Sequence, residues 1–345
     1  MDLPPLRFDP ILKHRAWGGD RLARWGREFD SAESIGESWD LADLPPGIPD
    51  GISRVAEGPL QGRTIADLRE ESPDALLGRL PVAATGGFPL LVKLLDAESD
   101  LSVQVHPDPA YAAAHPDTFV KNEAWYVLEA RPGAAVYRGI HPGVTPEGFL
   151  ESLHAGRLLD CLVRIEVRPG DCVRLPSGIC HALGAGVVVA EAQTPSDTTF
   201  RVWDWDRDDP DRPLHLEQAM ACMRFGAAQE DGRPAVSRAD EIPAVETDGV
   251  QVRRMCSTDD FTIDLIGLDG DRHEIRTSQE PTVVLATRGE SAVVDARGRT
   301  ARLAPGDIVL VPASCPSPEV RPAASSRKTE FLRIDLPATS PRTLA

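Results

Sequence analysis

An internal repeat is the feature of this sequence that most constrains its fold. The segments RPGDCVRLPSGICHAL (168–183) and APGDIVLVPASCPSPE (304–319) share a Gly-Asp turn, an apolar strand and a proline, and they align when Pro176 is placed on Pro312. Strands of this length, punctuated by glycine and proline, are typical of β architectures. The repeat therefore predicts two copies of one β unit.

The two copies differ at one position of chemical interest, because His181 of the first falls on Ser317 of the second. The repeat also extends towards the N-terminus, where EAWYVLEARPGAAVY (123–137) resembles EPTVVLATRGESAVV (280–294). The first copy contains about 20 additional residues, and these correspond to TPEGFLESLHAG and its flanks, a segment with helix start and stop signals. We expect a mainly β fold of two tandem barrels with a small helical insertion at about 143–160.

Length and composition agree with two β domains, which we expect over 1–230 and 240–338. The chain has 345 residues with 31 prolines and 28 glycines, a composition that favours many short strands. Helix signals are few, and one of them is Thr64 followed by Asp67, a variant of the capping box.

The net charge and the cysteine content limit the binding partners and the cellular compartment that we expect for this protein. The net charge of −17 argues against nucleic-acid and anionic-membrane partners. The first residues lack the basic segment and apolar core of a signal peptide, so we expect none, and no apolar run reaches about 18 residues, the length that spans a membrane. Six cysteines without a CxxC pair predict reduced thiols. We expect a cytoplasmic protein, a monomer or homodimer, with a small-molecule partner.

In the first copy of the repeat, strands whose residues alternate between polar and apolar place several polar side chains on one face. In LSVQVH, side chains two apart share a face, so Ser102, Gln104 and His106 point one way while Leu101, Val103 and Val105 point the other. The same rule places Lys121 and Glu123 together. Either stripe taken alone is usually a solvated sheet face.

A barrel interior that gathers four of these side chains would supply an amide oxygen, two imidazoles and one carboxylate. The four are Gln104, His106, Glu123 and His181. This set suits zinc or another borderline divalent ion. Because it brings one negative charge, the ion stays net positive and can act as a Lewis acid.

Charged residues within apolar strands are further candidates. Glu191 in VVVAEAQ is either part of an ion pair or a catalytic group with a raised pKa. Lys93 in LVKLL either snorkels or faces a polar pocket. In TTFRVWDWDR, Arg201 shares a face with Thr199 and follows Asp197 on the same parity, and its ordinary alternative is an ion pair with Asp204 or Asp206. His14 of HRAWGG could line a pocket.

These segments together resemble the class I mannose-6-phosphate isomerases (phosphomannose isomerases), zinc enzymes of the cupin fold that serve carbohydrate metabolism. The resemblance spans nearly the whole chain, is greatest to the shorter bacterial type, and rests on HRAWGGDRL, LSVQVHPD, KNEAWYVL, LPSGICHALG and VVVAEAQTPSDTTFR. It implies tandem cupin (jelly-roll) barrels, and a sugar phosphate as substrate. The implied reaction interconverts mannose 6-phosphate and fructose 6-phosphate through a cis-enediol.

The resemblance also assigns roles to residues. It implies one Zn²⁺ per chain on the first barrel, held by Gln104, His106, Glu123 and His181, with no metal in the second barrel. Arg201 corresponds to the active-site arginine, and Lys93 with Ser102 corresponds to the phosphate-holding positions. Lys121, Glu191 and Asp197 are the candidates for moving the proton.

Two other functions remain open on the residues alone. His106, Glu123 and His181 form a two-His-one-carboxylate set, as in non-haem iron oxygenases, although Gln104 and the lysines count against that interpretation. A non-catalytic sugar-binding cupin is the second alternative. The presence of Lys121 and Arg201 counts against it.

Overall fold

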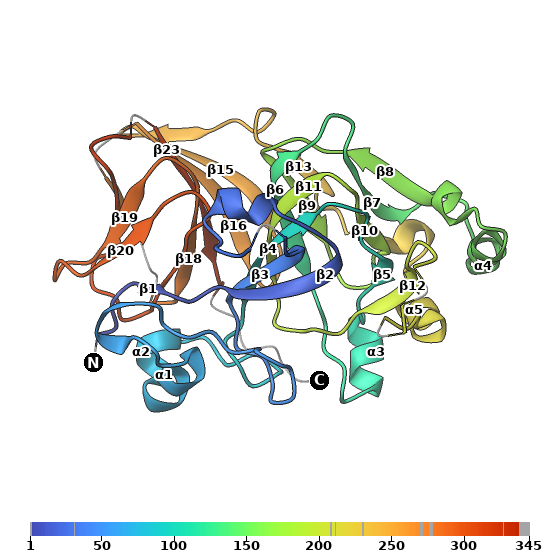
Figure 1. The fold of residues 1–345 in the computed structure, drawn as a ribbon, viewed down its shortest axis with the longest axis horizontal. Helices are drawn as coiled ribbons and strands as arrows, with labels where there is room; N and C mark the ends of the chain where they lie inside the picture. Colours follow the sequence, from blue (N-terminus) through green and yellow to red (C-terminus); the bar gives the residue numbers. More distant parts are fainter. Residues whose placement is uncertain are drawn as a thin grey trace.

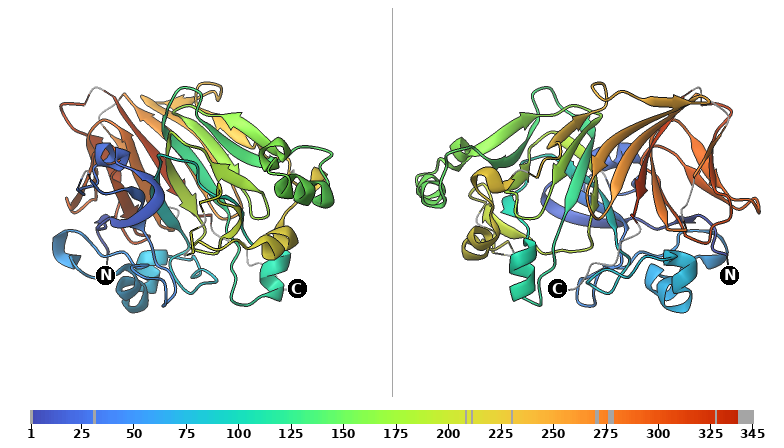
Figure 2. Two further views of the ribbon diagram at one scale, coloured as in Figure 1. Left: turned by 45° about the vertical axis from the view of Figure 1, so that its right-hand side comes forward. Right: turned by 180° about the vertical axis from the view of Figure 1, so that it is seen from behind.

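The fold consists of two β sandwiches lying side by side, as the two views of Figure 2 also show. The computed structural model describes residues 2–30, 32–207, 209–210, 212–229, 231–269, 272–275, 279–326 and 328–337. In Figure 1 the first sandwich is coloured mainly green and the second orange to red. The mainly β fold expected from the repeat is confirmed.

The first sandwich pairs a seven-stranded sheet with a five-stranded one. The seven-stranded sheet has the order β13 (Val236–Arg238), β9 (Asp171–Leu175), β6 (Glu123–Ala130), β11 (Val187–Gln193), β4 (Leu91–Ala97), β3 (Ile35–Leu41) and β2 (Ile11–Gly19). The five-stranded sheet has the order β12 (Phe200–Trp203), β5 (Val103–Val105), β10 (His181–Leu183), β7 (Ala135–Ile140) and β8 (Leu162–Glu166).

The second sandwich repeats this topology. Its seven-stranded sheet has the order β1 (Leu6–Arg7), β21 (Ile308–Val311), β18 (Thr282–Arg288), β23 (Thr329–Asp335), β16 (Thr262–Leu268), β15 (Val250–Ser257) and β14 (Val245–Thr247). Its second sheet has the order β17 (His273–Glu274), β22 (Glu319–Pro322), β19 (Ser291–Val294) and β20 (Thr300–Leu303). The run β9-β6-β11-β4 therefore corresponds to β21-β18-β23-β16, and β10-β7-β8 corresponds to β22-β19-β20.

The Gly-Asp turns of the two copies have the same geometry. Gly170 has φ of 94° and Gly306 has φ of 93°, a backbone conformation that favours glycine. Each following aspartate, Asp171 or Asp307, accepts a hydrogen bond from the backbone N–H three residues earlier, at 3.1 Å and 2.7 Å respectively. The repeated sequence thus encodes one repeated turn.

Helices are short and lie at the periphery (Figure 1). Three were expected: α1 (Ile65–Glu71), which has the Thr64–Asp67 capping box, α2 (Pro73–Leu77), which follows Ser72 and ends at Gly78, and α4 (Pro146–His154), the helical insertion between β7 and β8. The remaining helices are α3 (Pro109–Ala114), α5 (Leu216–Cys222), and the 3₁₀ turns η1 (Arg21–Trp25), η2 (Gly58–Leu60), η3 (Leu158–Cys161) and η4 (Gly226–Gln229). None of the described helices is long and apolar enough to cross a membrane.

The largest apolar core lies between the two seven-stranded sheets. Leu94, Tyr126 and Ala190 of the first sandwich share it with Leu265 and Leu285 of the second. Because side chains alternate across a strand, the neighbouring residues of β4, β6 and β11 face the interior of the first sandwich. These strands are buried on both faces, which explains their nearly continuous apolar sequences.

Strand pairing crosses the expected domain ranges at one place, where β1, near the N-terminus, pairs with β21 of the second sandwich. β13, which lies between the two expected ranges, pairs with β9 of the first. The division into 1–230 and 240–338 stays a prediction, and residue 338 lies outside the described residues.

The two turn glycines allow the cost of a steric clash to be measured separately from the cost of a positive φ. A Cβ on Gly306 would lie 2.2 Å from the carbonyl oxygen of Trp25, whereas one on Gly170 would lie 3.4 Å from its nearest neighbour, the Cβ of Ala239. We expect the positive φ to cost each alanine variant about 1 kcal/mol of unfolding free energy, and the clash to cost G306A about 1–3 kcal/mol more. Urea unfolding measures both values, and equal losses would contradict the account.

Candidate active site

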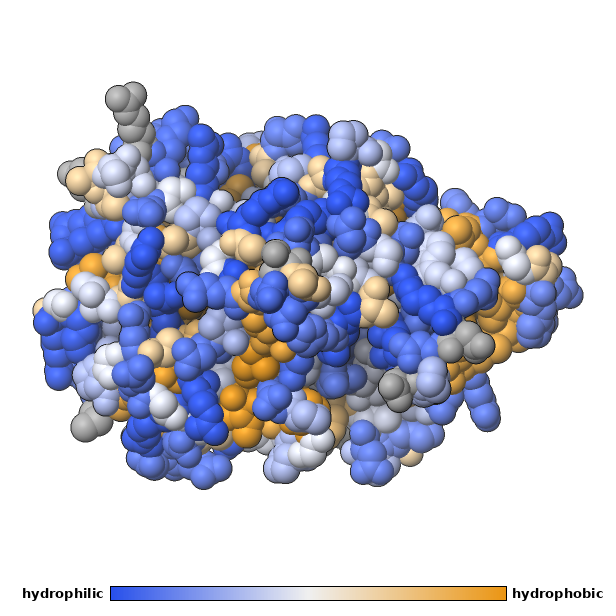
Figure 3. All heavy atoms as spheres, in the orientation of Figure 1, coloured by the Kyte–Doolittle hydropathy of each residue, from blue (hydrophilic) through white to orange (hydrophobic). Residues whose placement is uncertain are grey.

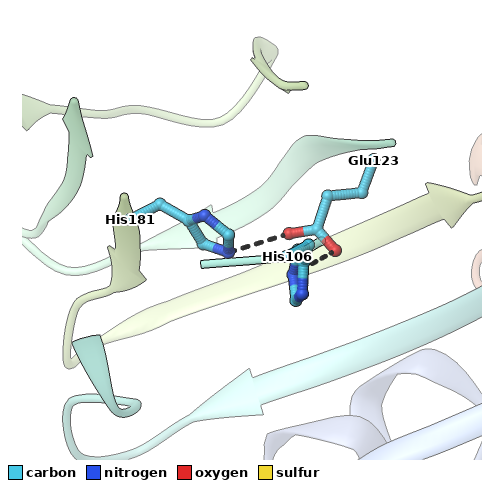
Figure 4. A group of neighbouring side chains, drawn as sticks. All are labelled: His106, Glu123 and His181. Atoms are coloured by element: carbon cyan, nitrogen blue, oxygen red, sulfur yellow. Dashed lines mark ion pairs between the residues drawn. The ribbon is translucent and has the colours of Figure 1, made fainter. Parts of the chain in front are cut away.

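Three buried side chains converge inside the first sandwich (Figure 4). His106 follows β5, Glu123 begins β6 and His181 begins β10, and their potential ligand atoms all lie within 4.8 Å of one another. The two carboxylate oxygens of Glu123 divide between the histidines. Oε2 is 3.4 Å from Nε2 of His106, and Oε1 is 3.2 Å from Nε2 of His181.

The backbone sets the orientation of both imidazole rings. Nδ1 of His106 lies 3.0 Å from the carbonyl oxygen of Thr198, and Nδ1 of His181 lies 2.8 Å from that of Ile179. A carbonyl oxygen only accepts, so each Nδ1 carries the proton, and each Nε2 presents a lone pair to Glu123. This outer hydrogen bond is the arrangement usual for metal-ligating histidines.

The group has buried acceptors that lack donors. Nε2 of His106 and both carboxylate oxygens of Glu123 are buried without a hydrogen-bond partner. Lone pairs that face one another in a buried site destabilise it unless a cation lies between them. The donor set of two imidazoles and a carboxylate therefore fits a divalent metal ion.

The pKa shifts favour the protonation states that a metal requires. Burial, and then the nearby charge of Lys121, lower the pKa of His106 to about 3, so its ring is neutral. Burial would raise the pKa of Glu123, but Lys121 and His106 outweigh it and hold that pKa well below its usual range. Neutral imidazole and ionised carboxylate are the ligating forms.

Gln104 reaches the same group from β5. Its amide nitrogen lies 3.3 Å from Nε2 of His181, and its oxygen accepts a hydrogen bond from Ser102 at 3.3 Å. An oxygen ligand at this place requires the amide to turn over, a change that leaves the shape of the side chain the same. The strand alternation thus brought all four expected ligands together.

A pocket of about 420 Å³ opens beside the group. Of the ten residues singled out from the sequence, seven line it: Lys93, Ser102, Gln104, Lys121, Glu191, Asp197 and Arg201. The other three are the buried His-Glu-His group, which Lys121 joins to the pocket through a contact of 3.1 Å with Glu123. His14 also lines the pocket, as the sequence suggested.

A row of charged side chains crosses the pocket, one from each of five neighbouring strands, and the charges alternate in sign after the first. After Glu123 on β6 come Glu191 on β11, Lys93 on β4, Glu37 on β3 and Arg15 on β2. Nζ of Lys93 lies 3.3 Å from Glu191 and 3.7 Å from Glu37, and Nε of Arg15 donates to Glu37 at 2.6 Å. Burial raises the pKa of Glu191, although Lys93 opposes the shift.

Indole groups hold the two middle carboxylates of this row. Trp125 donates its Nε1–H to Glu191 at 2.8 Å, and Trp39 donates to Glu37 at 2.6 Å. Both bonds restrict the rotation of the carboxylate that accepts them.

Arg201 lies next to the expected ligands rather than in a surface ion pair. Its backbone is the register partner of Gln104, and its Nε is buried without a hydrogen-bond partner. Asp204 is bound by Arg207 at 3.0 Å and Arg212 at 2.9 Å. The carboxylate of Asp206 accepts from the indole of Trp203. The ordinary alternative for Arg201 therefore has no support.

Strand periodicity did not predict several residues that line the pocket, and it predicted the wrong face for one of them. Glu37 in IGESWDL carries the signal used for Glu191, a charge within an apolar strand, whereas Arg212 lies in a loop without any periodicity. Leu101 was expected opposite Ser102, but it lines the pocket and packs in the inner core. The reason is that β5 begins at Val103, so the alternation does not extend back to residue 101.

The fold and the site together define a cupin-type enzyme with a candidate metal centre. Residues 6–133 match the family model described as phosphomannose isomerase type I, catalytic domain. The mannose-6-phosphate isomerase ManA of Bacillus subtilis is 38% identical over 67% of this chain and 71% of its own length. The putative mannose-6-phosphate isomerase YvyI of the same organism is 30% identical over 92% of this chain and 95% of its own length.

Solved structures agree with these relatives. The crystal structure of the mannose 6-phosphate isomerase from Bacillus subtilis superposes with a TM-score of 0.82 at 28% identity, covering 97% of this chain and all of that one. The chain belongs to the type I phosphomannose isomerase family and is an isomerase. Family membership favours this class over an oxygenase or a non-catalytic sugar-binding protein.

The charged row predicts a pH-dependent contribution to stability. Burial opposes ionisation of Glu37, but Lys93 and Arg15 outweigh it and lower its pKa from 4.5 to about 2. A depressed carboxyl pKa stabilises the fold above the unfolded pKa and loses this effect as the pH falls towards 2. We expect E37Q to lose about 3 kcal/mol of unfolding free energy at pH 7, with the deficit shrinking below pH 4.5.

Urea unfolding of wild type and E37Q at several pH values measures this deficit. A deficit that stays constant between pH 7 and pH 3 would show that the ionised carboxylate is not its source.

Proposed function

We propose that the protein interconverts mannose 6-phosphate and fructose 6-phosphate with one Zn²⁺ bound in the first sandwich. The observation that carries the proposal is the buried group of His106, Glu123 and His181, whose unpartnered acceptor atoms lie beside a pocket lined with cations. The names of the relatives support the substrate. All six cysteines are free and buried, in keeping with the reduced thiols expected of a cytoplasmic protein.

The reaction sets three chemical requirements. A proton must leave C2 of the opened sugar and one must arrive at C1, through a cis-enediol whose ionised form, the enediolate, carries negative charge on O1 and O2, and the hydroxyl proton of O2 must pass to O1. His106, Glu123 and His181, with Gln104 as fourth ligand, would hold the zinc ion, which supplies a positive charge near those oxygens. The protein must also carry the proton and grip the far end of the substrate.

We assign the proton transfer to Glu191. It is buried, lines the pocket, and lies one strand from Glu123, with Oε2 fixed by Trp125 and Oε1 facing Lys93. A raised carboxyl pKa brings such a group closer to neutrality, where a general acid–base catalyst works best. Lys121, which contacts Glu123, would donate a hydrogen bond to a sugar oxygen. Asp197 lies exposed at the rim and is the weaker candidate.

Arg201 is placed to stabilise charge that develops during the reaction. Its backbone pairs with that of Gln104 on the adjacent strand β5, and its buried Nε–H, inside the pocket, has no hydrogen-bond partner. Its guanidinium would hydrogen-bond the enediolate oxygens more strongly than the neutral hydroxyls of the substrate.

Metal analysis provides the first test of this proposal. We expect about one zinc ion per chain, and H181A should lose the metal and the isomerase activity together because one of the imidazole ligands is removed. H273A, which changes a histidine of the second sandwich, is the matched control and should keep both. Two ions per chain, or full activity after thorough chelation, would contradict the proposal.

The second test concerns Arg201. R201A should lower kcat by about 10²–10³ while KM changes little, because the contact forms mainly in the transition state. R201K should restore activity only in part, since an ammonium lacks the planar fork of a guanidinium. A variant that keeps its zinc and its fold and still turns over near the wild-type rate would make this arginine structural.

A further inference from the structure

The pocket has a net positive lining in a strongly acidic protein. Its charged lining residues are the cations Arg15, Lys93, Lys121, Arg201 and Arg212 and the carboxylates Glu37, Glu191, Asp197 and Asp209, five against four. The whole chain has a net charge of −17, and Figure 3 shows hydrophilic side chains over most of one face. An anionic substrate therefore meets an excess of positive charge here, and its distribution indicates where the anion binds.

The position of Lys93 makes it a poor binding partner for the phosphate of the substrate. Its ammonium lies between two carboxylates, 3.3 Å from Glu191 and 3.7 Å from Glu37, and the side chain is buried. A phosphate at this point would be repelled by both carboxylates. Ser102 lines the same pocket and donates to Gln104, one of the expected metal ligands. These two residues therefore lie at the reacting end of the pocket.

The opposite end of the charged row terminates in a guanidinium. Arg15 lies on β2, four strands away from Glu123 on β6. Its Nε is fixed by Glu37 at 2.6 Å. In an open-chain hexose 6-phosphate the phosphate is likewise at the end opposite to C1 and C2.

A second guanidinium lines the same pocket. Arg212, in the loop after β12, is held by Asp204 through two hydrogen bonds of 2.9 and 3.2 Å. Burial lowers the pKa of Arg201, and the charges of Arg212 and Arg15 lower it further, which places all three guanidinium groups around a common space. Guanidinium groups that repel one another are stabilised by a bound anion.

We propose that Arg15 and Arg212 form the phosphate subsite of this pocket, so that C1 and C2 of the substrate reach the His-Glu-His group. The inference rests on the proposed function and departs from the assignment of the phosphate to Lys93 and Ser102. The carboxylates of Glu37 and Asp204 orient the two guanidinium groups, and the N–H groups that do not bind these carboxylates are the donors available to phosphate oxygens. The two residues determine specificity for a phosphorylated sugar, and Arg201 acts on the reacting carbons.

The experiment compares R15Q and R212Q with two charge-matched controls. K13Q removes a cation from the same strand as Arg15, since Lys13 bonds the carbonyl oxygen of Pro49 and does not line the pocket. R207Q removes the other arginine that binds Asp204, and Arg207 does not line the pocket either. Zinc content and unfolding midpoint are measured for each variant.

Steady-state kinetics give the first measurement. R15Q and R212Q should each raise KM for mannose 6-phosphate, and the inhibition constant of inorganic phosphate, by about tenfold or more while kcat stays within about twofold. K13Q and R207Q should change both constants by less than about twofold. Equal rises of the two constants in K13Q and R207Q would show that any loss of positive charge near the pocket has this effect, and would contradict the assigned phosphate subsite. A selective rise of KM in K93M, with both arginine variants unchanged, would also overturn it.

Phosphate binding without turnover separates the subsite from the proposed function. Inorganic phosphate is titrated into the zinc-loaded protein, and the fluorescence of Trp17 and Trp125, which line the pocket, reports binding. If the wild type fails to isomerise mannose 6-phosphate but binds phosphate through Arg15 and Arg212, the function fails and the subsite stands. If it isomerises the sugar and both variants bind phosphate like the wild type, the subsite fails and the function stands.

Discussion

The site depends on a sheet that is buried on both faces. The seven-stranded sheet of the first sandwich packs one face against the second sandwich, through Leu94, Tyr126 and their neighbours, and turns the other face into its own interior. Lys93, Glu123 and Glu191 lie on that inner face and are almost completely buried. Charges removed from water in this way must be paired or must bind an ion. The second sandwich thus contributes to the chemistry by excluding water from the back of the sheet.

Sequence periodicity predicted the part of the fold that repeats. The Gly-Asp turns, the paired strand orders of the two sandwiches and the inserted helix α4 all follow from aligning 168–183 with 304–319. The terminal pairing of β1 with β21 did not follow, because a strand of two residues has no readable period. Helix α5 gives no start signal, because its N-cap His215 forms no side-chain cap hydrogen bond, whereas α3 has a cap, Asp108 before Pro109, and was predictable.

The site was predictable where it lies on strands and unpredictable where it lies in loops. Strand alternation grouped Gln104 with His106 and Lys121 with Glu123, and the structure brings both pairs to one centre. Glu37 follows the same rule and was overlooked only because it is far away in sequence. Arg212 had no such signal, because its position depends on a contact with Asp204 within a loop. Residues held by tertiary contacts alone are invisible to a periodicity argument.

The two sandwiches show how a duplicated fold carries one centre instead of two. By alignment and register, Glu280 takes the place of Glu123, and Asp335 that of Glu191. The bond from Thr282 to Asp335, at 2.8 Å, repeats the bond from Trp125 to Glu191. The carboxylates are therefore retained in the second copy, and Glu280 is likewise buried with one oxygen unpartnered.

The cations and imidazoles around those carboxylates differ between the copies. Asp335 is neutralised by Arg333 of its own strand at 2.9 Å, whereas Glu191 faces Lys93 of the neighbouring strand. By strand register, Pro318 takes the place of His181, one residue after the Ser317 given by the sequence alignment, so the second copy has no imidazole where the first presents a potential ligand. Arg333 pairs with Asp335 in the second sandwich, whereas buried lone pairs without donors leave the first open to a cation. The absence of an imidazole at this turn thus distinguishes the second sandwich from the first, which holds the candidate metal centre.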